Sequence, residues 1–110
     1  MENCVFCRII NGEIPTEFVY KDEELVAFRD INPKAPVHIL IVPRKHIPSI
    51  NELEDGDREL LGNLLLTAKK IAQEQGVDKS GYRLSVNVGE GGGQDVFHLH
   101  MHLKGGWKGV

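Results

Sequence analysis

The longest regular pattern in the chain is a series of apolar side chains at helical spacing. They recur every three or four positions between residues 60 and 72, on one face of a helix: Leu60, Leu61, Leu64, Leu65, Ala68, Ile71 and Ala72. We expect this helix to run from about Gly56 to Gln75. Asp55 is expected to cap its first turn and Gly76 to end it. It is predicted to be a scaffold that carries no chemistry.

The remaining patterns indicate strands and one short helix. Residues 6–10 predict a short helix that Asn11 and Gly12 close, and the β-rich runs are 17–20, 25–29, 37–42, 83–88 and the alternating run 97–103. The first two runs form a predicted hairpin. Strands in hairpin order together with one long helix favour an α+β fold with an antiparallel sheet. The length of 110 residues suits a single domain, residues 1–110.

Three histidines stand at alternate positions in the last predicted strand. His98, His100 and His102 therefore share one face, opposite Phe97, Leu99, Met101 and Leu103. Three buried imidazoles are costly unless each has a polar partner. The alternative without a functional role is a solvent-exposed face, but such a face rarely carries histidine at every position. The run therefore indicates a phosphate site, a metal site, or both.

Composition and charge narrow the class of protein. Hydrophobic residues make up 41% of the chain and charged residues 26%, as in ordinary soluble domains. The net charge is −3 and no long basic run occurs, so a nucleic-acid partner is disfavoured. The apolar runs are too short to span a membrane, and the N-terminus lacks the pattern of a signal peptide. We expect a cytoplasmic protein.

Cys4 and Cys7 form a second candidate site. In a reducing compartment the Cys-x-x-Cys spacing indicates metal binding or redox activity, and two small buried thiols are the alternative. A redox pair is disfavoured because the motif opens the chain instead of following a strand. Structural zinc takes four Cys or His ligands, so two more would come from the histidines. Besides the aligned three, these are His38, within a central strand, and His46, at its end.

A glycine-rich loop, residues 89–95, directly precedes the histidine strand. Glycines let backbone N–H groups approach an anion closely, so the loop is a candidate phosphate cradle. A flexible hairpin loop is the alternative interpretation. The spacing matches neither the Walker loop nor the dinucleotide fingerprint.

Several stretches together resemble a known family. The run from His98 to Lys104 resembles the histidine triad signature, in which histidines alternate with apolar residues, with Lys104 in place of the last apolar residue. Residues 6–15 resemble the family's opening helix, 27–33 its ribose-binding strand end and 36–47 its central strand. The resemblance implies the histidine triad fold, with about five antiparallel strands, one long helix and one short helix. Gly105-Gly106 resembles the Hint-like branch of purine nucleoside phosphoramidases more than the Fhit-like branch.

The resemblance implies a hydrolase that cleaves the P–N bond of purine nucleoside phosphoramidates or related nucleotidyl conjugates. His100 would be the nucleophile, a covalent nucleotidyl-histidine would form, and water would release AMP or GMP. His102 would bind the phosphate and help to protonate the leaving group. His38 completes the expected catalytic group.

The resemblance also implies binding residues. Val5, Phe6, Ile9, Phe28 and Ile31 would line the purine pocket, and Asp30 would accept from the ribose hydroxyls. The phosphate would be contacted by Asn87, Gly93, Gln94, His100 and His102, and Asp95 belongs to the same nucleotide-binding site. Some members of the family carry zinc on positions that correspond to Cys4, Cys7, His46 and His98. We therefore expect one structural zinc ion per chain. The family is typically homodimeric, so a homodimer is expected.

Three features depart from the family pattern. Asp95 stands where Ser or Thr is common, and its carboxylate would repel a phosphate dianion or favour a cationic amine in the leaving group. Lys104 replaces an apolar residue, and the chain lacks the longer tail that is usual in the Hint-like branch. The alternatives are a catalytically weak nucleotide-binding scaffold, a dinucleoside polyphosphate hydrolase, and a metal hydrolase with His98, His100 and His102 as its zinc ligands.

Overall fold

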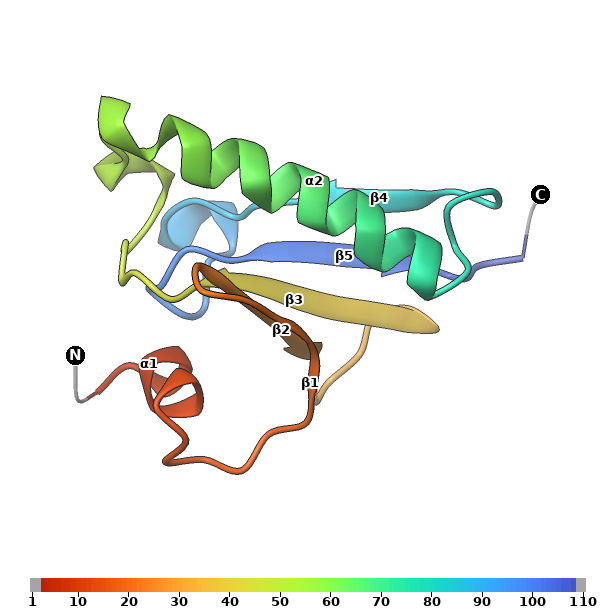
Figure 1. The fold of residues 1–110 in the computed structure, drawn as a ribbon, viewed down its shortest axis with the longest axis horizontal. Helices are drawn as coiled ribbons and strands as arrows, with labels where there is room; N and C mark the ends of the chain where they lie inside the picture. Colours follow the sequence, from red (N-terminus) through yellow and green to blue (C-terminus); the bar gives the residue numbers. More distant parts are fainter. Residues whose placement is uncertain (1–2, 109–110) are drawn as a thin grey trace.

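A five-stranded antiparallel sheet forms the centre of the molecule, in a computed structural model that describes residues 3–108. The strand order is β1-β2-β3-β5-β4 (Figure 1). The strands are β1 (Phe18–Lys21), β2 (Leu25–Arg29), β3 (Val37–Pro43), β4 (Tyr82–Ser85) and β5 (Met101–Gly105). The helices are α1 (Val5–Ile10) and α2 (Arg58–Glu74), with 3-10 turns η1 (Ile50–Glu52), η2 (Asp55–Asp57) and η3 (Glu90–Gly92). The predicted α+β fold is confirmed.

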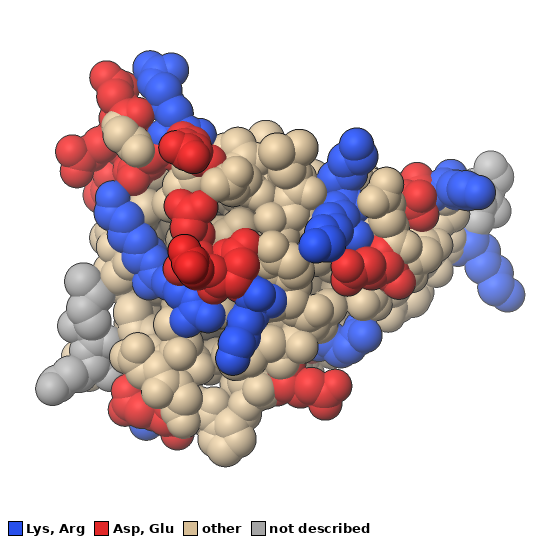
Figure 2. Space-filling model, in the orientation of Figure 1, with Lys and Arg blue, Asp and Glu red and all other residues tan. Residues whose placement is uncertain are grey.

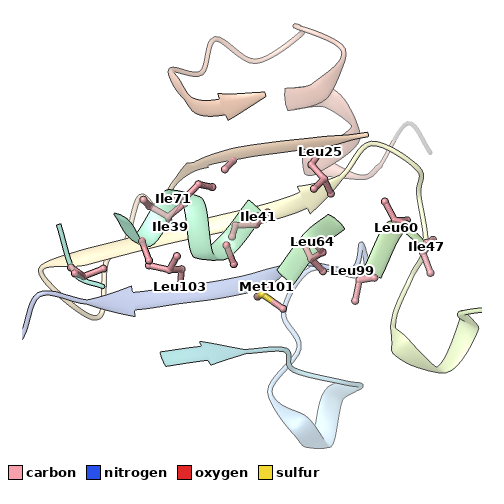
Figure 3. Close-up of a cluster of buried hydrophobic side chains, with 14 residues drawn as sticks. Leu25, Ile39, Ile41, Ile47, Leu60, Leu64, Ile71, Leu99, Met101 and Leu103 are labelled. Atoms are coloured by element: carbon pink, nitrogen blue, oxygen red, sulfur yellow. The ribbon is translucent and has the colours of Figure 1, made fainter. Parts of the chain in front are cut away.

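Helix α2 covers one face of the sheet with its apolar stripe. Leu60, Leu64 and Ile71 face the central strands β3 and β5, from which Ile39, Ile41 and Leu103 point back (Figure 3). Burial of each such aliphatic side chain contributes about 1.5 to 3 kcal/mol. This layer holds the larger of the two buried clusters, and the buried members of that cluster are Leu, Ile, Val, Ala and Met.

The opposite face of the sheet is covered by α1 and the segment that follows it. Phe6 and Ile9 of α1 pack on Phe28, Leu40 and Val42. The first four residues of β2 are buried, since both faces of this strand are covered. The second, smaller cluster lies beside the histidines, so the chemistry of the chain belongs to the α1 side of the sheet.

The start of α2 differs from the prediction. A 3-10 turn, η2, precedes the helix, and Asp55 is not the cap: its exposed carboxylate lies 3.5 Å from Arg58. Instead the buried Asp57 accepts from the backbone N–H of Glu54 at 2.9 Å and from Lys45 Nζ at 2.8 Å. Leu65, expected on the buried stripe, is exposed because it lies at the edge of that stripe.

The last two strands are shorter than predicted. β4 ends at Ser85, whose partner is His102, and β5 begins at Met101. Residues 97–100 leave the ladder, so Val86 and Val88 have no strand to pair with. The alternation still holds across this break, because Leu99 and Met101 join the α2 layer while His98 and His100 contact Phe6 on the other side. Only His102 of the three lies within a strand.

Charged groups of both signs are interspersed on the face shown in Figure 2, and no broad area of one sign is visible there. Within residues 3–108 there is no helix with the length and hydropathy needed to cross a bilayer.

Candidate active site

A cavity of about 700 Å³ opens on the α1 side of the sheet. Its walls include most of the residues predicted to bind a nucleotide: Val5, Phe6, Ile9, Phe28, Asp30, Ile31, Asp95, His100 and His102. Its lining combines apolar side chains of α1 and β2 with two histidines and the carboxylates of Glu17, Asp30 and Asp95. A cavity of this kind suits a flat apolar base attached to a polar, anionic group.

Other lining residues were not predicted from the sequence. They are Ile14, Pro15, Thr16, Glu17, Val19, Arg29, Asn32, Leu40 and Val96. Two of them follow from alternation: Leu40 lies two residues after His38, and Val96 two residues before His98. The segment from Ile14 to Glu17 has no such signal, because only the return of the chain from α1 to β1 brings it to the cavity.

His100 lines the cavity, and within residues 3–108 its Nε2 has no hydrogen-bond partner, with Asp95 Oδ1 at 3.9 Å. Its Nδ1 donates to the backbone carbonyl of His98 at 2.8 Å, so in the neutral ring Nε2 carries the lone pair. The side chain is buried against the ring of Phe6, with centroids 5.0 Å apart. The hydrogen bond fixes both the tautomer and the direction of the ring, and these are the requirements for a nucleophilic imidazole.

His38 and His102 form a second, linked pair. The backbone N–H of Lys34 donates to His38 Nδ1 at 3.0 Å, which leaves the proton of a neutral His38 on Nε2. His38 Nε2 lies 3.0 Å from His102 Nδ1 and donates to it. His102 therefore carries its own proton on Nε2, and this N–H is available to a ligand. The imidazole in the central strand thus has a polar partner on each nitrogen.

The surroundings keep both rings neutral. Burial, together with the neighbouring His100, His38 and Lys104, lowers the pKa of His102 to about 4, against a smaller raising effect of Asp30. Burial also lowers the pKa of His38, while Asp30 opposes that shift. At neutral pH His102 is a hydrogen-bond donor without charge, which agrees with the proton positions derived from the contacts.

Asp30 lies at the edge of this pair. Its Oδ2 is 3.5 Å from His38 Nε2, and its Oδ1 accepts from the backbone N–H of Asn32 at 2.8 Å. The carboxylate lines the cavity, two residues along the chain from the apolar Phe28. That position suits its predicted role as the acceptor for ribose hydroxyls.

The remaining two histidines, His46 and His98, lie beside the two cysteines at the N-terminal end of α1. Cys4 is the N-cap of this helix and Cys7 lies in its first turn, so the helix holds the two sulfurs together. His98 Nδ1 lies 3.3 Å from Cys4 Sγ and 3.6 Å from Cys7 Sγ, and 3.1 Å from Nδ1 of His46. Cys7 Sγ lies 3.3 Å from His46 Nδ1. The fold therefore brings together all four predicted zinc ligands.

The spacing of these four atoms fits a tetrahedral zinc ion. Zn–S and Zn–N bonds of ordinary length place nitrogen and sulfur about 3.6 Å apart and two nitrogens about 3.3 Å apart. All four candidate ligand atoms lie within 4.8 Å of one another. His98 Nε2 donates to the carbonyl of Pro43 at 2.7 Å, which leaves its Nδ1 lone pair facing the cysteines. The donor set is that of a closed, structural site.

The cysteines do not fit a redox pair. Burial, together with the hydrogen bond and charge of Cys4, raises the pKa of the Cys7 thiol to about 11. Redox-active cysteines instead have lowered pKa values, because the thiolate is the reactive form.

His98 is separated from the other two triad histidines, since its ligand nitrogen faces Cys4 and Cys7. The alternative of a metal held by the three triad histidines therefore has no support in their geometry.

Hydrogen bonds from the side chains of Asn87 and Gln94 hold the glycine-rich loop in place. Asn87 Nδ2 donates to the carbonyl of Gly92 at 2.8 Å, and Gln94 Nε2 donates to those of Pro48 and Val96 at 2.7 and 3.0 Å. Gly93 has φ +84°, and a Cβ there would lie 3.2 Å from Asn87 Nδ2. Asn87, Gly93 and Gln94 do not line the cavity. Their predicted contact with phosphate stays a prediction.

Comparison with known proteins places this site in a family. Residues 3–106 match the family model described as scavenger mRNA decapping enzyme C-term binding. The chain is 47% identical over 105 residues to a purine nucleoside phosphoramidase of Escherichia coli (strain K12), covering 96% of this chain and 88% of that protein. It is 45% identical to the protein HitA of Neisseria gonorrhoeae, covering 96% and 97%.

Solved structures agree with these sequence matches. A HIT family hydrolase from Legionella pneumophila Philadelphia 1 is 55% identical with a TM-score of 0.94, over 96% of this chain and 95% of that chain. A HIT family hydrolase from Clostridium thermocellum is 47% identical with a TM-score of 0.95, over 97% and 93%. These likenesses extend over nearly the whole chain, in sequence and in fold, and they show that it belongs to the histidine triad family.

Proposed function

We propose that this protein hydrolyses the P–N bond of purine nucleoside phosphoramidates or related nucleotidyl conjugates and releases AMP or GMP. The observation that carries the proposal is the free Nε2 of His100 in the lining of the largely apolar cavity. The Escherichia coli relative named as a purine nucleoside phosphoramidase supports the choice of substrate. The apolar walls provided by Phe6, Ile9 and Phe28 would hold the purine.

In the proposed reaction His100 acts as the nucleophile. Its Nε2 lone pair attacks the α-phosphorus, a P–N bond to the ring forms, and the P–N bond to the amine breaks as the departing nitrogen takes up a proton from solvent water. Water then attacks phosphorus and frees the ring. Overall one water is consumed, with its hydroxyl on phosphorus and its proton on the amine. The covalent intermediate replaces one displacement by two easier ones.

His102 would assist as a neutral donor. Its Nε2–H is held ready by the hydrogen bond that Nδ1 accepts from His38. The N–H would bind a phosphoryl oxygen or the departing nitrogen as negative charge develops there. The predicted help in protonating the leaving group therefore takes the form of a hydrogen bond, because the lowered pKa keeps His102 uncharged at neutral pH.

A zinc ion would be held by Cys4, Cys7, His46 and His98. When bound it would supply structural cross-linking between α1 and the segments that follow β3 and precede β5. His98 connects the metal cluster with the catalytic site. Its side chain belongs to the cluster, and its backbone carbonyl orients His100. His100 and His102 remain free for the chemistry.

We also propose a homodimer in the cytoplasm. Leu65 and Leu66 are exposed on α2, and β4 is an edge strand, so both offer surface for a second copy. Two free thiols in a metal-type cluster suit a reducing compartment. Sedimentation equilibrium would test the dimer, and a single species of 12.3 kDa would exclude it.

The experiment that tests the function is AMP release from adenosine 5′-phosphoramidate. We expect release by the parent protein and none by His100→Ala, while Lys69→Ala, an exposed change on α2, behaves as the parent. Calorimetric titration with AMP and the melting temperature show whether His100→Ala still folds and binds. AMP binding without release by the parent would refute the enzyme and favour a nucleotide-binding scaffold.

A further inference from the structure

A second hollow adjoins the catalytic cavity. It measures about 840 Å³ and shares Val5, Asp95 and Val96 with that cavity. The rest of its lining is Asn3, Cys4, His46 and Phe97. We call it the side groove. The two hollows therefore adjoin at Val5, Asp95 and Val96.

The geometry of displacement at phosphorus suggests what the side groove holds. The attacking and leaving groups stand roughly in line on a phosphorus undergoing displacement. The apolar walls provided by Phe6, Ile9 and Phe28 would hold the purine, so the leaving group needs another exit. Asp95 lines both hollows, and its Oδ1 lies 3.9 Å from the nucleophilic Nε2 of His100. The distal end of a short stem on the leaving nitrogen can therefore reach this carboxylate by turning into the groove.

The charge and surface of the groove are uneven. Asp95 is its one charged residue among those described, since no Lys, Arg or Glu lines it. The Asp95 side chain is 82% exposed, and within residues 3–108 no Lys or Arg forms an ion pair with it. Farther along, Phe97 is 51% exposed and Val5 offers apolar surface. The groove is therefore anionic next to the reacting bond and apolar beyond it.

We propose that the side groove is the leaving-group subsite and that Asp95 selects amines whose organic part carries a positive charge on a short apolar stem. Leaving groups with negative charge, such as the phosphates of dinucleoside polyphosphates or a carboxylate, are rejected. The inference rests on the proposed phosphoramidase function and names the leaving group that it prefers. Phe97 contacts the stem, and its exposed ring face is available to the cation.

The size of the preference follows from Coulomb's law. Two unit charges about 5 Å apart in water change an equilibrium about fourfold, and the sign reverses for like charges. A cationic and an anionic leaving group of the same shape would then differ about fifteenfold at low salt. Because Asp95 is exposed, physiological salt reduces the ratio to about fivefold, and about 1 M salt removes most of it.

The test uses three adenosine 5′-phosphoramidates of similar shape, made from diaminopropane, n-butylamine and β-alanine. They carry a distal positive charge, no charge and a negative charge. We expect kcat/KM of the parent to fall in that order, with the salt dependence given above. Asp95→Asn, which keeps the shape and removes the charge, should level the order, whereas Asp95→Glu should retain it. The same order in Asp95→Asn as in the parent would overturn the proposal.

Failure of the proposed function is distinguishable from failure of the subsite. Calorimetric binding of the three compounds to His100→Ala makes the same comparison without turnover. Equal affinities there, or an order that Asp95→Asn in the same background leaves intact, contradict the subsite even if hydrolysis occurs. The variant Phe97→Ser tests the stem: it should weaken the butylamine compound about fourfold for each methylene that the ring covers. The unsubstituted phosphoramidate, which has no stem, should not change.

Discussion

Acidification should destabilise the protein through His102, whose neutral form the fold requires. In the folded protein burial and nearby positive groups lower its pKa to about 4, from an ordinary value of 6.5. Between these two pH values the unfolded chain binds a proton at this ring and the folded chain does not. Stability therefore rises with pH through this window and is lost as pH falls from 6.5 to 4. Above pH 6.5 this residue contributes no pH dependence.

The magnitude follows from the size of the window. Each pH unit in which one extra proton is bound by the unfolded state costs about 1.4 kcal/mol. The full interval from 6.5 to about 4 costs about 3 kcal/mol. The reason is structural: a second proton on His102 would have to sit on Nδ1, which accepts from His38 Nε2 at 3.0 Å. His38 contributes in the same direction, because its pKa is also lowered.

The assay is urea unfolding at intervals between pH 4 and pH 8, for the parent and for His102→Gln. Glutamine keeps a hydrogen-bonding group at this position and has no titration. Loss of zinc at low pH affects both proteins alike, so the difference between their curves isolates the ring. We expect the parent to lose about 3 kcal/mol more than the variant across the window. Parallel curves would refute a neutral, buried His102.

Two further predictions concern the scaffold. Chelation, or Cys7→Ser, should remove about one zinc per chain, as measured by elemental analysis, and should lower the melting temperature by on the order of 10 °C. The control Lys69→Ala should keep its metal. AMP release should decrease but persist, and its immediate loss in a protein that stays folded would favour a metal hydrolase. Ile71→Ala should cost about 3 kcal/mol in urea unfolding because Ile71 is fully buried on the side of α2 that faces the sheet. The exposed Lys69→Ala should stay within about 0.5 kcal/mol, and equal costs would contradict the assigned layer.

Patterning along the chain was enough to identify the elements that bury an apolar face. The stripe on α2 and the run in β3 were predicted because period and burial are local properties of the sequence. The ends of the strands were predicted less accurately where a neighbouring strand decides them. β4 stops at Ser85 because its neighbour β5 begins at Met101, and no local signal in residues 86–88 records that.

The types of residue in the site also came from the sequence alone. Alternating histidines, a Cys-x-x-Cys pair and a resemblance to the histidine triad family singled out each residue of the catalytic and metal groups. Their division into two centres was not visible in the alternation itself, which puts all three triad histidines on one face. Only the packing of α1 beside the loop after β3 directs His98 to the cysteines and leaves His100 facing the cavity.

The sequence by itself determined the fold class, the apolar stripe of the long helix and the chemical groups available, because these depend on period and residue type. The tertiary structure decided the protonation and direction of each ring, because these depend on partners far along the chain. Lys34 fixes His38, which in turn fixes His102, and the carbonyl of His98 fixes His100. It also decided that Asp95 stands between the catalytic cavity and the side groove, since a cavity exists only where distant segments meet.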